Sequence, residues 1–175
     1  MPTSPAVSVV IPAYKASEWI EATLESLLRQ TYPVRDLEIL VVDDASPDDS
    51  SDIARRFLER HSLNGRVIVR EQNGGVGAAR TTGWDSASGD WIQFLDADDL
   101  LAPHKLELQV RCASQVEDNV AVVYSNWQYL VLRDGSWQPT GGLNAPFVDD
   151  NPVEQILQEQ TFGYVGPTLI RKSIV

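Results

Sequence analysis

Four short apolar runs in the first hundred residues each lead directly into a polar or glycine-rich cluster. The runs are rich in β-branched residues, which is typical of strands buried on both faces of a sheet. The segments between them carry apolar residues at helical spacing, and strands that alternate with helices predict βαβ units and a largely parallel sheet. We therefore expect an α/β fold, with strands over residues 7–11, 37–42, 66–70 and 91–95.

The ends of the predicted elements follow from residues that start or stop helices and strands. Pro12 is expected to stop the first strand, and Ser17 to cap a helix that Tyr32-Pro33 ends. Pro103 is typical of the first position of a later helix. Two further helices are predicted, over residues 49–61 and from Ala78 to Ser88-Gly89. A strand over residues 120–132 is expected to turn back at Asp134-Gly135 as a hairpin. A loop over 138–152, a short helix over 153–160 and a strand over 168–170 complete the prediction.

The composition limits the class of protein. A chain of 175 residues suits one domain with a buried core, and its single cysteine, Cys112, excludes an internal disulfide. No apolar run approaches the roughly 18 residues that span a bilayer, and the first residues lack the basic and apolar segments of a secretory signal. We expect a single domain over residues 1–175 in the cytoplasm, with a peripheral position at the inner face of a membrane left open.

The four polar clusters define the expected ligand site. In parallel α/β sheets, ligands bind outside the carboxyl ends of the strands, and each cluster follows one of the predicted strands. We therefore expect the clusters to meet at one edge of the sheet. They are Pro12-Ala13-Tyr14, Asp43-Asp44, residues 71–77 and residues 96–99.

Asp96 and Asp98 are separated by one residue, so an extended chain projects both carboxylates to the same side. Two neighbouring carboxylates repel each other, and a bound cation resolves the repulsion. Ligands that are all oxygen suit Mg²⁺ or Mn²⁺, which keep waters and recruit phosphate oxygens. The alternative is a helix cap, because Asp98 and Asp99 precede a predicted helix, and one aspartate can cap the helix while the other binds metal.

The net charge of −11, from 25 acidic and 14 basic residues, bears on the kind of ligand. It excludes a chain that binds nucleic acid in bulk, because that function needs a basic surface. Two unit charges about 5 Å apart interact by roughly 3 kcal/mol at an effective dielectric constant of about 20, and a diphosphate beside two carboxylates sums several such repulsions to about 10 kcal/mol. We therefore expect a diphosphate to bind at the acidic cluster only together with a divalent ion.

The other two clusters each allow two interpretations. A carboxylate of Asp43-Asp44 can accept a hydrogen bond from a nucleobase ring N–H, but an Asx-turn or helix cap explains the pair more simply. The glycine loop over residues 73–77 can present backbone N–H groups to a phosphate, or it can be a tight turn that positions the next helix. It is not a dinucleotide-binding fingerprint, because Arg80 replaces the third glycine, and it lacks the P-loop lysine. Arg80 itself suits a phosphate, Asp96 or a surface ion pair.

The ordered set of motifs resembles the family 2 glycosyltransferases, whose nucleotide-binding fold is called GT-A. The resemblance runs from residue 8 to residue 106, and residues 163–174 are similar to the family's strand that leads toward its acceptor site. Thr81 departs from the pattern, since the family often has asparagine there. The resemblance implies a three-layer α/β sandwich with a mostly parallel central sheet. The motifs that carry it lie in residues 7–14, 17–30, 41–46, 73–83 and 94–99.

The resemblance also implies a role for each candidate residue. Asp98 ligates Mn²⁺ or Mg²⁺ at the diphosphate, and Asp96 lies near the ribose or the metal. The implied nucleotide-sugar site combines residues that flank the nucleobase (Pro12, Ala13 and Tyr14), the acceptor of its ring N–H (Asp44), residues beside the phosphates and sugar (Asn73, Gly75 and Arg80) and the segment at the ribose and metal (Asp96, Ala97 and Asp98).

The implied activity is an inverting, metal-assisted transfer of a sugar from a nucleoside-diphosphate sugar, with UDP as the expected nucleotide, to a hydroxyl of a saccharide or lipid-linked acceptor. The family's base is a carboxylate expected beyond Val175, so we expect a domain truncated at its C-terminal end that binds the donor without turning it over. Two other functions remain open, a nucleotide-sugar-binding module and a sugar nucleotidyltransferase. The nucleotidyltransferase would need a basic, glycine-rich loop after the first strand, where Pro12-Ala13-Tyr14-Lys15 stands.

Overall fold

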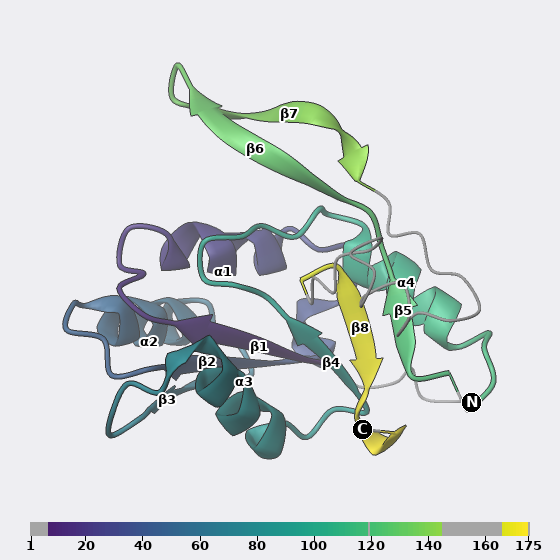
Figure 1. Cartoon of the computed structure of the whole chain (residues 1–175), viewed down its shortest axis with the longest axis horizontal. Coiled ribbons are helices and arrows are strands. Elements are labelled where there is room, and N and C mark those ends of the chain that lie inside the picture. The colour runs from purple at the N-terminus through teal and green to yellow at the C-terminus, as the bar shows by residue number, and fades with distance from the viewer. Residues whose placement is uncertain (1–6, 119, 145–165, 175) are drawn as a thin grey trace, which may run out of the picture.

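The computed structural model describes residues 7–118, 120–144 and 166–174, which form a six-stranded sheet with helices on both faces and a separate two-stranded hairpin (Figure 1). No helix in these ranges is long and apolar enough to cross a bilayer. The strands are β1 (Val7–Ala13), β2 (Leu37–Asp43), β3 (Gly65–Val69), β4 (Trp91–Phe94), β5 (Val122–Tyr124), β6 (Trp127–Arg133), β7 (Ser136–Asn144) and β8 (Thr168–Arg171). The helices are α1 (Ile20–Leu28), α2 (Ser50–Arg60), α3 (Gly75–Ser86) and α4 (Lys105–Ala113), with the 3-10 helices η1 (Val34–Asp36) and η2 (Lys172–Ile174).

The main sheet has the strand order β3-β2-β1-β4-β8-β5. β2 and β4 both run parallel to β1, with Val7 in register with Leu37 on one side and with Trp91 on the other. β3 extends the parallel group beyond β2, whereas β8 runs antiparallel to both β4 and β5. The chain thus moves outward from β1 to β3 and then returns across β1 to β4. Ligand sites of α/β proteins lie at such switches in strand order.

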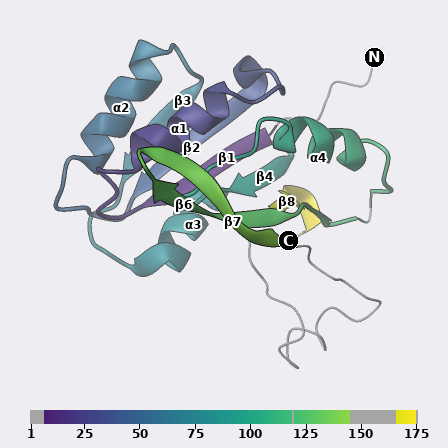
Figure 2. The ribbon, with the colours of Figure 1, turned by 90° about the horizontal axis from the view of Figure 1, so that it is seen from above.

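The sheet separates two hydrophobic cores. Helices α1, α2 and α4 cover one face and α3 covers the other (Figure 2). Successive residues of β1 point to opposite faces, so Val9 belongs to the core under the three helices, while Val10 packs against α3 at Gly83. Coverage of both faces explains why β1 and β2 carry continuous apolar runs. The predicted three-layer α/β fold with a mostly parallel sheet is confirmed.

The prediction that Pro12 stops the first strand is wrong, because β1 continues through it to Ala13. The backbone N–H and C=O groups of successive residues in β1 point alternately toward its two neighbouring strands. The Val10 carbonyl, two residues before Pro12, accepts the Leu95 N–H on the β4 side, so the backbone nitrogen of Pro12 faces that side too. The pairing of β1 with β4 ends at the register of Val10 and Phe94. Pro12 therefore faces a side where the ladder has ended, and its missing N–H costs no hydrogen bond.

The predicted ends of the first helix are also wrong. Ser17 does not cap it, because α1 begins at Ile20 without a side-chain cap and the Ser17 N–H instead donates to the Asp48 carboxylate. The helix ends at Leu28, before Tyr32-Pro33. A contact with a loop thirty-one residues away thus takes precedence over the local capping preference.

The C-terminal half differs from the prediction in how its strands are divided. The expected strand over residues 120–132 is two strands, β5 in the main sheet and β6 in the hairpin. The Ser125 N–H donates to the Pro167 carbonyl at 3.0 Å, which continues the pairing of β5 with β8, and the chain leaves the sheet after this residue. The hairpin turn at Asp134-Gly135 and the strand near residue 168 are confirmed. Residues 138–144 belong to β7 and not to a loop. The rest of that loop and the helix predicted over 153–160 lie outside the described residues.

A polar cluster fixes α4 and the segment before β8 to the sheet. The Lys105 ammonium group donates to the side-chain carbonyls of Gln93 and Gln109, the latter at 2.6 Å. The Gln109 amide in turn donates to the Val123 and Pro167 carbonyls, both at 2.9 Å. Burial lowers the pKa of Lys105 from 10.5 to about 7.

Candidate functional site

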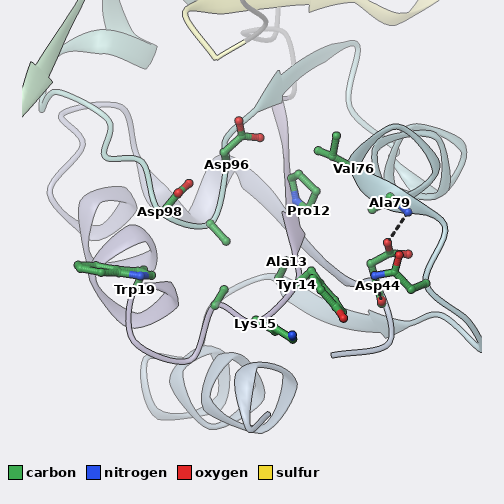
Figure 3. Close-up of a pocket in the computed structure, with 14 residues that line it drawn as sticks. Pro12, Ala13, Tyr14, Lys15, Trp19, Asp44, Val76, Ala79, Asp96 and Asp98 are labelled. Atoms are coloured by element: carbon green, nitrogen blue, oxygen red, sulfur yellow. Dashed lines mark hydrogen bonds between the residues drawn. The ribbon is translucent and has the colours of Figure 1, made fainter. Parts of the chain in front are cut away.

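A pocket of about 470 Å³ opens where β1, β2 and β4 end (Figure 3). All but one of the candidate residues predicted from the sequence line this pocket; the exception is Arg80. The predicted residues that line it are Pro12, Ala13, Tyr14, Asp44, Asn73, Gly75, Asp96, Ala97 and Asp98. The sequence prediction missed Lys15, Ala16, Trp19, Val76 and Ala79, which also line it.

The loop after β1 is fixed by the loop after β2. Three successive backbone N–H groups, those of residues 15–17, donate to Ser46 Oγ at 3.1 Å, Ser50 Oγ at 2.8 Å and Asp48 Oδ2 at 3.1 Å. Burial alone would raise the pKa of Asp48, but hydrogen bonds from the side chains and backbone N–H groups of Ser50 and Ser17 outweigh it and lower that pKa. The loop can therefore hold Lys15 at a φ of 54°. This anchoring places the exposed side chains of Tyr14 and Lys15 at the pocket.

Asp44 is a buried carboxylate in the pocket wall. It accepts hydrogen bonds from the Gly74 N–H at 3.1 Å, from the Gly75 N–H at 2.7 Å and from the Arg70 guanidinium. Burial raises its pKa, but these three donors more than compensate and lower the pKa below its ordinary value. The turn predicted for the Asp43-Asp44 pair is formed by Asp43, whose side chain accepts the Ser46 N–H at 3.1 Å. Asp44 is left to face the pocket as an ionised, rigidly held group.

The glycine loop is a tight turn that is tied to Asp44. The Asn73 side-chain amide donates to the Asp44 carbonyl at 3.2 Å, and Gly75 adopts a φ of +83°, which favours glycine. The Gly74 and Gly75 N–H groups point at the Asp44 carboxylate, so they do not point at a phosphate. Of the two interpretations of this loop, the structure supports the turn that positions α3, whose Val76 and Ala79 line the pocket.

Asp96 and Asp98 have different surroundings. Arg80 Nη2 donates to Asp96 Oδ1 at 2.6 Å, and the same guanidinium lies 5.9 Å from the centre of the Phe94 ring. Arg80 is thus the partner of Asp96, one of the roles foreseen for it. Asp98 is exposed, and no side chain or N–H group in the described residues binds its carboxylate. Figure 3 shows Asp96 and Asp98 close together at the same end of the pocket.

The alternative in which these aspartates cap a helix is wrong. α4 begins at Lys105 and its N-terminal flanking residue is His104, well beyond Asp98 and Asp99. The Asp99 N–H closes a turn on the Asp96 carbonyl at 3.0 Å. The acidic cluster therefore belongs to the pocket and not to a helix terminus.

The acidic residues fit a divalent ion that is completed by a ligand. In the described part of the chain, no three His, Cys, Asp or Glu side chains are placed to hold a metal by themselves. Asp98 and Asp96 offer carboxylate oxygens, the type of ligand that Mg²⁺ and Mn²⁺ prefer, and these ions take further oxygens from water and phosphate. Arg70 and Arg80 offset Asp44 and Asp96, which leaves Asp98 as the lining carboxylate without a cationic partner among the described residues.

The fold and the pocket define an α/β protein with a cavity at the carboxyl ends of its parallel strands, beside two aspartates one residue apart. The model of the family described as glycosyl transferase family 2 matches residues 8–140. The chain belongs to this family, as the sequence motifs implied.

Two curated relatives match the same part of the chain. It is 36% identical over 125 residues to the UDP-Glc:alpha-D-GlcNAc-diphosphoundecaprenol beta-1,3-glucosyltransferase WfgD of Escherichia coli, which covers 71% of this chain and 46% of WfgD. It is 36% identical over 116 residues to the glycosyltransferase EpsJ of Bacillus subtilis, which covers 66% of this chain and 31% of EpsJ. The chain therefore spans less than half the length of either relative.

Solved structures of similar fold contain nucleotides. The mannosyltransferase PcManGT from Pyrobaculum calidifontis, in complex with GDP-Man and Mn²⁺, has a TM-score of 0.65 at 30% identity, over 70% of this chain and 36% of that one. Residues 1–349 of S. aureus TarS, in complex with UDP, have a TM-score of 0.55 at 33% identity, over 62% of this chain and 31% of that one. These similarities confirm the expected GT-A fold.

Proposed function

We propose that this chain carries the donor-binding domain of an inverting glycosyltransferase, which moves a sugar from a UDP-sugar to a hydroxyl of a saccharide or lipid-linked acceptor. The observation that carries the proposal is the pocket at the switch in strand order, which holds a buried ionised Asp44 at one end and, at the other, Asp98, which has no cationic partner in the described part of the chain. Membership of family 2 supports it, as do the nucleotide complexes of PcManGT and TarS.

Asp44 and Tyr14 suit the nucleobase end. A carboxylate has about four acceptor positions, and the described donors reach two on each Asp44 oxygen: the Arg70 guanidinium on one oxygen, the Gly75 N–H on the other, and the Gly74 N–H on both at 3.1 Å. Because the Gly74 N–H is shared between the two oxygens, the ring N–H of a nucleobase would compete with it for one of them. Tyr14 is 47% exposed, so its ring is free to lie against a base. The choice of UDP is supported by the complexes of TarS with UDP and with UDP-GlcNAc.

Asp98 and Asp96 suit the phosphate end. Bound there, Mn²⁺ or Mg²⁺ would stabilise the negative charge of the departing nucleoside diphosphate. Arg80 fixes the Asp96 carboxylate, so that Asp96 keeps one orientation while Asp98 stays free to bind. Among the described residues that line the pocket, Lys15 is the one with a cationic side chain. Its ammonium group lies 5.4 Å from the centre of the Tyr14 ring.

Calorimetric titration of the chain with UDP and with GDP, each in Mn²⁺, in Mg²⁺ and in chelator, tests the proposal. UDP should bind at least about tenfold more tightly with the metal than in chelator, since the repulsion removed is several kcal/mol and 1.4 kcal/mol is tenfold. Asp98→Asn should erase that difference. The matched control is Asp85→Asn, which removes an exposed carboxylate of α3 outside the pocket.

Equal UDP affinity in metal and in chelator would refute the metal-assisted site. Tighter binding of GDP than of UDP would refute the assignment of the base. Release of UDP from a UDP-sugar in the presence of acceptors measures the transfer itself, and the absence of nucleotide binding altogether would refute the proposed function.

A further inference from the structure

A second pocket, of about 170 Å³, lies between the β6-β7 hairpin and the body of the domain. On the body side it is lined by α1 with the residue before it, and by the acidic cluster with the residue after it; on the other side it is lined by β6. Figures 1 and 2 both show the hairpin lying over α1, away from the edge of the main sheet. The lining residues are Trp19, Ala22, Thr23, Asp98, Asp99, Leu100, Gln128, Tyr129 and Leu130.

The two pockets share a wall. Trp19 and Asp98 line both of them, and Figure 3 shows these two side chains at the same end of the first pocket. In a transfer reaction the attacking atom has to come within roughly 3–3.5 Å of the reacting carbon. An acceptor must therefore sit in a space that adjoins the donor's phosphate and sugar end, which is where the second pocket lies.

The lining of the second pocket combines aromatic faces with oxygen acceptors. Tyr129 is 64% exposed and Trp19 is 39% exposed, so both rings present surface to a ligand. The Tyr129 ring is held edge-on by Trp127, with ring centres 5.0 Å apart at 89°. The Gln128 amide nitrogen donates to the Gly141 carbonyl at 3.0 Å, which leaves its oxygen available to accept. Asp99 adds a carboxylate to this wall.

This chemistry matches a sugar ring. The apolar C–H face of a pyranose packs on an aromatic ring, and its hydroxyl groups donate to carboxylate and amide oxygens. The charged side chains of the described lining, Asp98 and Asp99, are both acidic, which disfavours an anionic occupant. The volume is below the roughly 300–1,000 Å³ of pockets that enclose drug-sized ligands, so the occupant is about one hexose in size.

We propose that the pocket between α1 and the β6-β7 hairpin is the acceptor subsite, where Tyr129 and Trp19 bind one neutral saccharide ring of the acceptor beside Asp98. The proposal rests on the proposed function, because the shared wall is meaningful only if the first pocket holds the donor. It assigns the hairpin to recognition of the acceptor and the strand-end pocket to the donor.

Ligand-detected NMR on the chain saturated with UDP and Mg²⁺ tests this assignment. The probes are the methyl glycosides of glucose, galactose, mannose and N-acetylglucosamine, each measured by saturation transfer. At least one should bind to the wild-type chain, and Tyr129→Ala should weaken its binding at least about fivefold, whereas Tyr129→Phe keeps the ring and should retain it. Tyr124→Ala is the matched control, because Tyr124 is an exposed tyrosine on β5 that lines neither pocket.

UDP affinity, measured by calorimetry in the same samples, separates the two proposals. A chain that binds UDP with Mg²⁺ but none of the four glycosides would overturn the acceptor subsite and leave the donor site standing. So would a glycoside that binds Tyr129→Ala as tightly as the wild type. Failure of the wild-type chain to bind UDP would instead refute the donor function.

Discussion

Replacement of Gly83 by alanine should loosen the contact between α3 and β1. An added Cβ atom would lie 2.2 Å from Val10 Cγ1, 3.2 Å from Cγ2 and 3.3 Å from Cβ, all closer than an ordinary contact of 3.4 Å or more. Val10 is fully buried in the centre of the sheet, so it has little room to move away. The helix must therefore shift outward.

The expected loss of stability follows from two opposing effects. Forcing an extra carbon into a packed core costs about 1–3 kcal/mol, while alanine in place of glycine within a helix contributes about 0.5–1 kcal/mol. The net loss is about 1–2 kcal/mol in the free energy of unfolding. For a domain of this size, that loss lowers the Tm by about 2–8 °C.

Thermal unfolding followed by circular dichroism measures the change, and Gly77→Ala is the matched control. A Cβ at Gly77, in the same helix, meets nothing within 4 Å, so this variant should be as stable as the wild type or about 0.5 kcal/mol more stable. Val10→Ala should partly rescue Gly83→Ala, because it removes the atoms in conflict. A Gly83→Ala variant with an unchanged Tm, or one that Val10→Ala does not rescue, would refute the close packing of α3 on β1.

Further expectations concern the site and the polar cluster under β8. Asp44→Ala should weaken UDP binding by about 1–3 kcal/mol in calorimetry, since it removes a buried charged acceptor; unchanged affinity in a folded variant would show that Asp44 only fixes the glycine loop. The folded-state pKa of Lys105 is below its unfolded value, so the unfolded chain binds more protons between about pH 7 and 10 and stability rises with pH there. We therefore expect denaturant unfolding from pH 6.5 to 9 to show that the free energy of unfolding of the wild type rises relative to that of Lys105→Met by about 1.4 kcal/mol per pH unit above pH 7. Parallel plots of the two unfolding free energies against pH would contradict this.

The strands and most of the pocket could be predicted because their signals are local. Each polar cluster follows its strand within a residue or two, so knowing where β1, β2 and β4 end is enough to place Tyr14, Asp44 and Asp98 at one edge. Their contacts could not be predicted in the same way. That Asp43 makes the turn while Asp44 faces the pocket depends on where Ser46 and Gly74 lie in the folded chain.

The parts that escaped prediction depend on contacts distant in sequence. Lys15 and Trp19 reach the pocket because the β1–α1 loop is held by side chains of the next crossover, about thirty residues later. The second pocket needs the chain to leave the main sheet after Ser125, whose N–H and hydroxyl group are both held by the Pro167 carbonyl, forty-two residues away. No periodicity in the sequence reports either contact.

The strand order has a consequence for the chain as it leaves the ribosome. β1 is made first, yet it lies between β2, which begins at Leu37, and β4, which begins at Trp91. Once β2 and β3 have emerged they can pair with one edge of β1, while the other edge of this apolar strand stays open until β4, which follows β3 by some twenty residues, has emerged as well. Open apolar edges pair readily with other chains. Nascent copies on neighbouring ribosomes are therefore most exposed to cross-pairing while α3 emerges, and slow translation during that emergence would lengthen the interval.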